Sequence, residues 1–483
     1  MIPTDMLPDD VLLAIFEFCV VEDQSTKTLW HSVTKKEIEA WHSLTHVCRQ
    51  WRSVVFGSPH RLKLRLVCTT GTPARDRLDV WPAFPLFVWC YNNHQTGTVD
   101  NIIAALERSD RVCQIHFSRK VPSSLLEKVF GSMQKPFPEL TRLELTSYDE
   151  MAPVLPDSFL GGSARRLQSL WLNGIPFPGL RNFLLSATHL TELHLLRIRH
   201  SEYLSPQAIL TVLSALTGLE TFRLEFQSPR SRPDWASRLL PPPTRSVLPV
   251  LTSLIFEGVS EYLEDFVARI DAPRLNELKV ILFNQIVFDT PQFIQFIGRT
   301  PMSKALETAH IAFDKCDRSA RVLLSSKKYG IGSLSVDVSC RMFDWLVSSV
   351  EQVCTSCLPP LSTLEDLYMY ETQYGPDRQE SQDNLENALW MELLSPFAAV
   401  ENLYLSRKFA PHIAPALQEL VGSRTMEVLP NLQNIFLEGL QPSGPIEEAI
   451  GRFVASRQIA SHPVVVSRWV LSLLDNLRMQ DIT

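Results

Sequence analysis

The most regular feature of the chain is a hydrophobic pattern, apolar-x-x-apolar-x-apolar, that recurs along most of its length. Clear copies begin at Val112, Leu140, Leu167, Leu190, Leu219, Leu251, Leu275, Leu364, Val400 and Leu432, and weaker ones at Leu306 and Ile331. The twelve starts span 320 residues in eleven steps, a mean period of about 29 residues. One match of this kind is common in helices, but twelve at a near-constant period indicate an array of structural repeats.

Each copy predicts a short strand whose alternate apolar residues point inward, followed by a helix or turn on the outer side. The linking segments 206–216, 262–270 and 292–297 have helical apolar spacing, and the polar stretches 228–246 and 374–383 are typical of loops between repeats. Stacked units of this kind form a solenoid with parallel strands inside and helices outside. We therefore expect an α/β array over residues 61–460.

The end of the chain predicts a cap for this array. Residues 446–457 have an amphipathic helical pattern, and an apolar run follows from Pro463 to Val466. A solenoid must cover the apolar face of its last repeat. We therefore expect residues 461–483 to form a C-terminal cap.

The first sixty residues follow a different pattern and predict a small all-α module. Leu7-Pro8-Asp9-Asp10 is typical of a helix start, because proline suits the first turn and aspartates favour the positive end of the helix dipole. Apolar residues then recur at helical spacing from Val11 to Cys19, and again from Trp41 to Val55, before Gly57-Ser58-Pro59 ends the second helix. We expect residues 1–60 to form this module.

Composition and charge narrow the class of protein. The chain is 45% hydrophobic and 20% charged with a net charge of −7, so it lacks the basic character typical of a nucleic-acid-binding domain. It shows neither the basic start and apolar run of a signal peptide nor an apolar run of roughly 18 residues that would span a membrane. Nine cysteines, an odd number, favour reduced thiols. We expect a cytoplasmic or nuclear protein that binds neither membranes nor nucleic acid.

The motifs that would indicate catalysis are missing from the sequence. There is no phosphate-binding loop, dinucleotide fingerprint or nucleophile elbow. Cys354 and Cys357 have the spacing of zinc ligands, but no second pair follows at a suitable interval, so two thiols in the core or at the surface are the better interpretation. We expect no catalytic residue, no metal site and no cofactor.

The N-terminal module resembles an F-box. The matching residues are Leu7-Pro8, the apolar run from Val11 to Phe16, and Leu44-x-x-Val47-Cys48-Arg49-x-Trp51-Arg52. The array resembles the leucine-rich repeats that often follow an F-box, although it lacks their regular asparagine and should therefore be irregular. As a whole the chain looks like the F-box proteins expanded in mushroom-forming fungi.

This resemblance implies the substrate-recognition subunit of an SCF-type ubiquitin ligase. The F-box would dock on a Skp-family adaptor, which connects to a cullin scaffold and a RING subunit, and the repeats would bind a protein substrate. One departure from the family keeps an alternative open, because an apparent insertion at 21–36 lengthens the F-box. In that alternative the chain is an interaction scaffold that works without a ligase.

Two sets of residues are candidates for binding. Exposed apolar side chains on small helices suit the adaptor, although some of them, Ile15 and Trp51 especially, could instead hold the module together. The adaptor candidates are Leu7, Pro8, Leu12, Ile15, Phe16, Val47, Cys48 and Trp51.

The substrate candidates are aromatic residues that lie between the inward apolar positions of the repeats, on the opposite face of their strands. They are Trp171, Tyr368, Tyr370, Tyr404 and Phe436. Four of them cluster in the last repeats and would provide anchors for a substrate. In the alternative interpretation, the C-terminal cap or a loop covers these rings.

Overall fold

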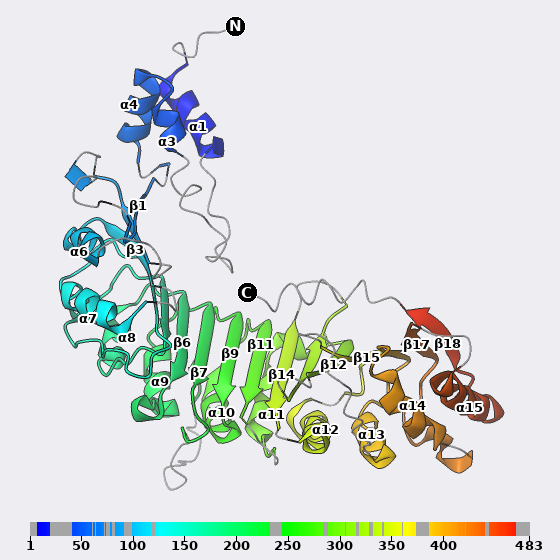
Figure 1. Ribbon diagram of the computed structural model, residues 1–483. Helices are drawn as coiled ribbons and strands as arrows, with labels where there is room; N and C mark the ends of the chain where they lie inside the picture. Colours follow the sequence, from blue (N-terminus) through cyan, green and yellow to red (C-terminus); the bar gives the residue numbers. More distant parts are fainter. Residues whose placement is uncertain are drawn as a thin grey trace. The chain divides into compact units, whose positions relative to one another are not determined.

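The computed structural model describes most of the chain. The described residues are 7–19, 41–59, 61–62, 64–71, 73, 78–79, 83–90, 99–117, 121–231, 244–283, 288–304, 306–314, 318–327, 332–340, 342–359, 361–372, 386–420, 422–439 and 444–469. They form a mixed α/β fold with a large, mostly parallel sheet (Figure 1). The chain divides into two compact units, the first ending at Ile198 and the second beginning at Arg199.

The first unit contains the helical module and six strands among its described residues. Its helices are α1 (Asp9–Cys19), α3 (His42–Thr45), α4 (Arg49–Gly57), α6 (Val99–Glu107), α7 (Ser123–Ser132), the short η2 (Phe159–Gly162) and α8 (Leu180–Ser186). Its strands are β1 (Leu66–Cys68), β2 (Leu86–Cys90), β3 (Val112–Phe117), β4 (Arg142–Thr146), β5 (Ser169–Asn173) and β6 (Glu192–Ile198).

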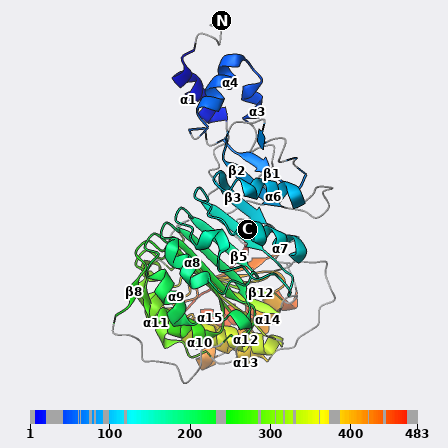
Figure 2. The same ribbon diagram turned by 90° about the vertical axis from the view of Figure 1, so that its left-hand side faces the viewer.

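The helical module differs from the sequence prediction at one point. The segment expected to form one helix from Trp41 to Val55 forms two, α3 and α4. Cys48 separates them, because its backbone is extended and its sulfur accepts a hydrogen bond from the Trp51 amide at 3.4 Å, which caps α4. Helix α1 packs on α4 (Figure 2).

Strands β1 to β6 lie in sequence order and pair in parallel, as the repeat pattern predicts. The leucines of the repeats fall in register, so that Leu143 pairs beside Leu170 and Leu170 beside Leu193, and all three are fully buried. The repeat copies begin at β3, so they include neither β2 nor β1, which has only three residues.

The second unit contains most of the repeats. Its helices are η3 (His200–Glu202), α9 (Pro206–Leu213), α10 (Ser260–Val267), α11 (Pro291–Arg299), η5 (Pro301–Lys304), α12 (Phe343–Gln352), the π-helical η6 (Val353–Cys357), α13 (Asn387–Leu394), α14 (Ala410–Gln418), η7 (Gly422–Met426) and α15 (Pro445–Ile459). Its strands are β7 (Thr221–Phe226), β8 (Ser246–Val247), β9 (Ser253–Gly258), β10 (Ile270–Asp271), β11 (Glu277–Leu282), β12 (Thr308–Asp314), β13 (Ser319–Ser325), β14 (Ser333–Ser339), β15 (Asp366–Glu371), β16 (Asn402–Leu405), β17 (Asn434–Glu438) and β18 (Val465–Trp469).

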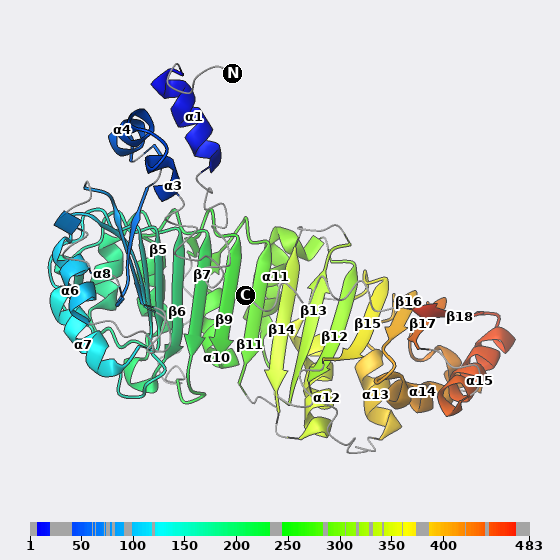
Figure 3. The same cartoon turned by 45° about the horizontal axis from the view of Figure 1, so that its top comes forward.

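The expectation of parallel strands throughout is wrong at one place in the second unit. The strand order there is β7-β9-β11-β14-β13-β12-β15-β16-β17-β18, and β13 pairs antiparallel with both of its neighbours (Figure 3). Only four residues join β12 to β13 and seven join β13 to β14, whereas a parallel crossover needs a dozen or more. The two weak repeat copies, at Leu306 and Ile331, lie in this reversed segment, and Ile331 itself is outside the described residues.

Helices cover one face of this sheet (Figure 1). The predicted helices at 206–216, 262–270, 292–297 and 446–457 are confirmed as α9, α10, α11 and α15. Consecutive repeats are also tied together: the Glu264 carboxylate of α10 accepts hydrogen bonds from the backbone amides of Gln292 and Phe293, at 3.0 and 2.8 Å, and so satisfies free N–H groups at the start of α11.

The stretch expected to be a C-terminal cap contributes a strand to the sheet. Val465 to Trp469 form β18, which pairs in parallel with β17. The remainder of the expected cap, 470–483, lies outside the described residues, as do the insertion at 21–36, the loop 374–383 and most of the loop 228–246.

Candidate binding surfaces

The helical module divides the adaptor candidates into an interior set and an exposed set. Leu12 and Phe16 are fully buried, and the Phe16 ring packs edge-on against Trp51 with ring centroids 4.8 Å apart. These two side chains hold α1 against α4, so they offer no surface to a partner while the helices remain packed.

The other candidates reach the surface. Pro8 is exposed, and Ile15 and Val47 are 39% and 54% exposed. Leu7, Cys48 and Trp51 are half-buried. Because Ile15 points outward, a purely internal role does not describe it.

Sequence reasoning missed two exposed residues of α1. Phe18 is 93% exposed and Val11 is 40% exposed. With Ile15 they follow the spacing i, i+4, i+7, which places them along one side of the helix. We call Val11, Ile15 and Phe18 the α1 stripe. Helix α1 has apolar residues on more than one side, so the sequence could not separate the buried side from the exposed one.

A stack of aromatic rings lies on the second unit's sheet, on the face opposite the helices. His310, Tyr368, Tyr404 and Phe436 are in register on β12, β15, β16 and β17. Successive ring centroids are 4.4, 4.1 and 4.5 Å apart, with planes within 9° of parallel. We call these four residues the aromatic ladder and this face of the sheet the ladder face.

The structure thus brings together three substrate candidates, Tyr368, Tyr404 and Phe436, and adds His310, which the sequence analysis did not select. Tyr370 lies beside them, edge-on to His310 at 6.4 Å. Trp171 belongs to the first unit, where it stacks on His194 at 4.2 Å.

Burial sets the protonation of the ladder. It lowers the pKa of His310 to about 4, against a smaller opposing effect of Asp366, so the imidazole is neutral near pH 7. Burial also raises the pKa of Tyr368 and of Tyr404, so both phenols keep their protons. The ladder is therefore an uncharged surface with hydroxyl groups along it.

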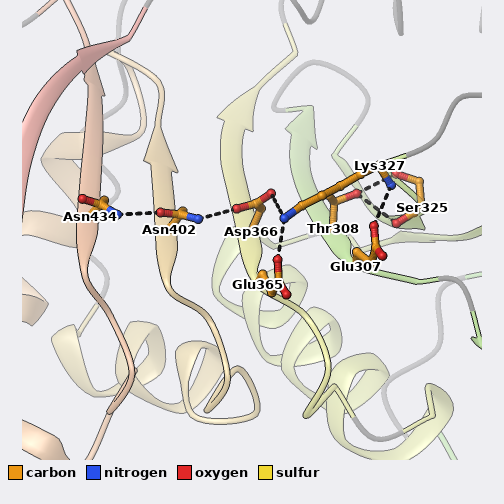
Figure 4. Close-up of polar contacts among 8 residues, drawn as sticks. All are labelled: Glu307, Thr308, Ser325, Lys327, Glu365, Asp366, Asn402 and Asn434. Atoms are coloured by element: carbon orange, nitrogen blue, oxygen red, sulfur yellow. Dashed lines mark hydrogen bonds and ion pairs between the residues drawn. The ribbon is translucent and has the colours of Figure 1, made fainter.

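A polar row runs beside the ladder, two residues earlier on each strand (Figure 4). Asn434 donates to Asn402 at 2.8 Å, and Asn402 donates to Asp366 at 2.7 Å. Lys327 pairs with Asp366 at 3.2 Å and with Glu365 at 2.6 Å. These hydrogen bonds, mainly the one to Glu365, raise the pKa of Lys327 to about 12.

The polar row is satisfied internally. Asn434, Asn402 and Asp366 are linked from strand to strand, so the row ties β15, β16 and β17 together. This leaves the ladder, with its apolar rings, as the part of the face better suited to bind a partner.

One aromatic residue from the C-terminal strand lies over the ladder. The ring of Trp469 is 5.6 Å from that of Tyr404 and 6.0 Å from that of Tyr368, inclined by 66° and 57°. The alternative in which the C-terminal region covers these rings is therefore realised in part, by the side chain of Trp469.

The cysteine pair lies in the core. Cys354 and Cys357 are buried in η6. Burial raises the pKa of both thiols, that of Cys357 to about 11. Among the described residues no group of three or more histidine, cysteine or acidic side chains has the geometry of a metal site.

Two further findings bear on the class of protein. Within the described parts of the chain, no helix has the length and apolar content needed to cross a membrane. The chain matches no known protein family and no curated protein.

Proposed function

We propose that this chain is the substrate-recognition subunit of an SCF-type cullin–RING ubiquitin ligase. The N-terminal module would act as an F-box and bind a Skp-family adaptor, and the repeats, as irregular leucine-rich repeats, would hold a protein substrate. Such a receptor carries no catalytic residue of its own and works in the cytoplasm or nucleus.

The observation that carries the proposal is that the helical module buries some of its apolar side chains and leaves others exposed. Leu12 and Phe16 fill its interior, while Pro8, Ile15 and Val47 remain at the surface. Exposed apolar side chains that form one patch mark a surface that is buried on association, and we propose that these residues form such a patch. The Leu-Pro start and the Val-Cys-Arg-x-Trp-Arg segment that resemble an F-box supply Pro8 and Val47 to this exposed set.

The ladder face supports the second half of the proposal. Tyrosine and tryptophan are enriched among residues that dominate protein interfaces, because they bury a large area at low cost in conformational entropy. Three neighbouring strands of the second unit each present an aromatic residue on this face. We propose this ladder as the substrate-binding site.

The test is a pull-down of the full chain with a purified Skp-family adaptor. Replacing Ile15 and Val47 together by aspartate buries two charges at the proposed interface, so we expect at least roughly a tenfold loss of affinity. The combined change Leu7→Ala/Pro8→Ala should weaken binding in the same direction. As a matched control, Ile459→Asp changes an apolar residue that is 86% exposed on α15, outside the module, and should bind normally.

Circular dichroism of each variant establishes that it is folded. If folded wild-type chain does not bind the adaptor, the ligase role is wrong. The repeats would then serve the alternative role, an interaction scaffold that works without a ligase.

A further inference from the structure

The last strand of the sheet is attached differently from the strands before it. In β17, Ile435 and Leu437 are buried. At the matching positions of β18, Val466 is 37% exposed and Arg468 is exposed, and no residue of β18 is buried.

The cause is the position of β18 at the edge of the sheet. In the described part of the chain, helices pack behind the earlier strands, and the last of them is α15, which precedes β18 (Figure 1). Full burial of a valine or leucine side chain contributes about 1.5–3 kcal/mol, and β18 lacks this contribution. Within the strand itself, backbone hydrogen bonds such as that from the Val465 amide to the Gln433 carbonyl at 2.8 Å therefore contribute more than side-chain burial, and the buried Val464 lies just before the strand.

The ring of Trp469 provides a further attachment. The register places Trp469 on the ladder face, beside Glu438, and from there its ring reaches back over Tyr404 and Tyr368. The chain's own C-terminal strand thus presents an aromatic residue to the surface proposed for substrate.

We propose that β18 occupies the binding site of the substrate and is displaced by it. The substrate is an extended peptide segment with an aromatic residue, which replaces β18 at the edge of β17 and puts its ring over Tyr368 and Tyr404. This inference rests on the proposed role of the ladder face in substrate binding, and it names both the class of substrate and the contact that holds the site closed.

The geometry defines the partner. An exposed strand edge binds an extended segment through backbone hydrogen bonds, while pockets for alternate side chains give specificity. At this edge the segment would run parallel to β17. Its aromatic residue would stand at the position of Trp469, four residues after the one paired with Asn434. The ladder is uncharged there, so an apolar ring suits it better than a charged group.

Two variants of the full chain test the displacement. Val465→Pro removes the amide that donates to Gln433, because proline has no N–H. Trp469→Ala keeps the backbone ladder and removes only the ring. Ile459→Ala, on the exposed side of α15, is the control for loss of an apolar side chain nearby.

The probe is a fluorescein-labelled peptide with the sequence of residues 463–469, and its binding is measured by fluorescence anisotropy. We expect it to bind Val465→Pro and Trp469→Ala about tenfold more tightly than wild type or Ile459→Ala. A peptide with alanine in place of the tryptophan should lose that gain. Equal binding to all four chains, or no loss with the alanine peptide, overturns the proposal.

Hydrogen exchange of the wild-type chain provides a second measurement that does not depend on the variants. The amides of β18 should exchange faster than those of β17, because opening the edge strand is local. Equal protection of the two strands overturns displacement. Adaptor binding is measured on the same variants. The peptide assay reports on the ladder face alone and the adaptor assay on the ligase role, so failure of the displacement proposal is distinct from failure of the ligase proposal.

Discussion

Glu257 lies on the ladder face of β9 and is the most strongly perturbed carboxylate that the structure describes. It pairs in register with Glu225 of β7. Burial is the main reason that its pKa rises from 4.5 to about 7, and repulsion from Glu225 and Asp337 adds to it, against attraction from Arg223 and Lys279.

The raised pKa makes the stability of the second unit depend on pH. The folded protein holds the Glu257 proton up to about pH 7, whereas the unfolded chain releases it near pH 4.5. The Glu257 proton therefore stabilises the folded state. This contribution to the free energy of unfolding is fully present below pH 4.5 and is lost as the pH rises through 7. A tenfold change in an acid dissociation constant corresponds to about 1.4 kcal/mol, which sets a ceiling of about 3 kcal/mol. Because water reaches part of the side chain, we expect about 1–2 kcal/mol.

The change Glu257→Gln tests this reasoning, because glutamine has nearly the same shape and no charge to lose. At pH 8 the variant should be more stable than wild type by about 1–2 kcal/mol, which corresponds to roughly 2–8 °C in Tm for a unit of this size. At pH 4 the two proteins should unfold at nearly the same temperature. Differential scanning calorimetry between pH 4 and pH 8.5 measures the difference.

The control is Glu220→Gln, a change at an exposed glutamate just before β7. Its difference from wild type should show little dependence on pH. If the stability gained by Glu257→Gln is the same at pH 4 and pH 8, or if the variant is less stable at pH 8, the assigned environment of Glu257 is wrong.

Three further predictions concern stability and reactivity. Gly174→Ala should destabilise the first unit by about 2 kcal/mol or more in urea unfolding, since Gly174 has a φ of +64° and an added Cβ would lie 2.4 Å from the Ser147 carbonyl oxygen. The control Gly131→Ala, on α7 with open space around it, should stabilise the protein by roughly 0.5–1 kcal/mol. Equal effects of the two changes would contradict the structure. Arg457→Met should lower the free energy of unfolding by about 2–4 kcal/mol, because the fully buried guanidinium donates to the carbonyls of Val428 and Pro430 at 3.2 and 3.1 Å. Hydrogen exchange around η7 and α15 measures this loss, and unchanged protection there would count against this role of Arg457. Cys354 and Cys357 should resist alkylation by iodoacetamide in the native chain and react only on unfolding, because burial raises the pKa of both thiols; rapid native labelling seen by mass spectrometry would contradict their burial.

The repeat pattern in the sequence predicted most strands and several helices of this protein. Leucines at a fixed spacing define which side of each strand is buried, and a strand that slips by one residue would expose them. Leu143, Leu170 and Leu193 illustrate this, since they are paired in register and fully buried. The same alternation placed Tyr368, Tyr404 and Phe436 on the other face, where the structure has them.

The sequence could not determine features that depend on which strands become neighbours. The reversed order of β12, β13 and β14 follows from short connections that forbid a parallel crossover, and the weak repeat copies there gave no sign of it. The addition of His310 to the ladder follows from that reversal, because it places β12 beside β15.

Only the tertiary structure decided which apolar side chains of α1 are exposed and what lies over the ladder. Val11, Leu12, Ile15 and Phe16 all fit one helical pattern, and the packing of α4 against one side of α1 buries Leu12 and Phe16 while Ile15 stays outside. Trp469 is far from Tyr368 and Tyr404 in the chain and reaches them through the pairing of β18 with β17. Local periodicity sets the inward side of an element, whereas the identity of its neighbours depends on contacts between distant segments, which a periodic pattern does not encode.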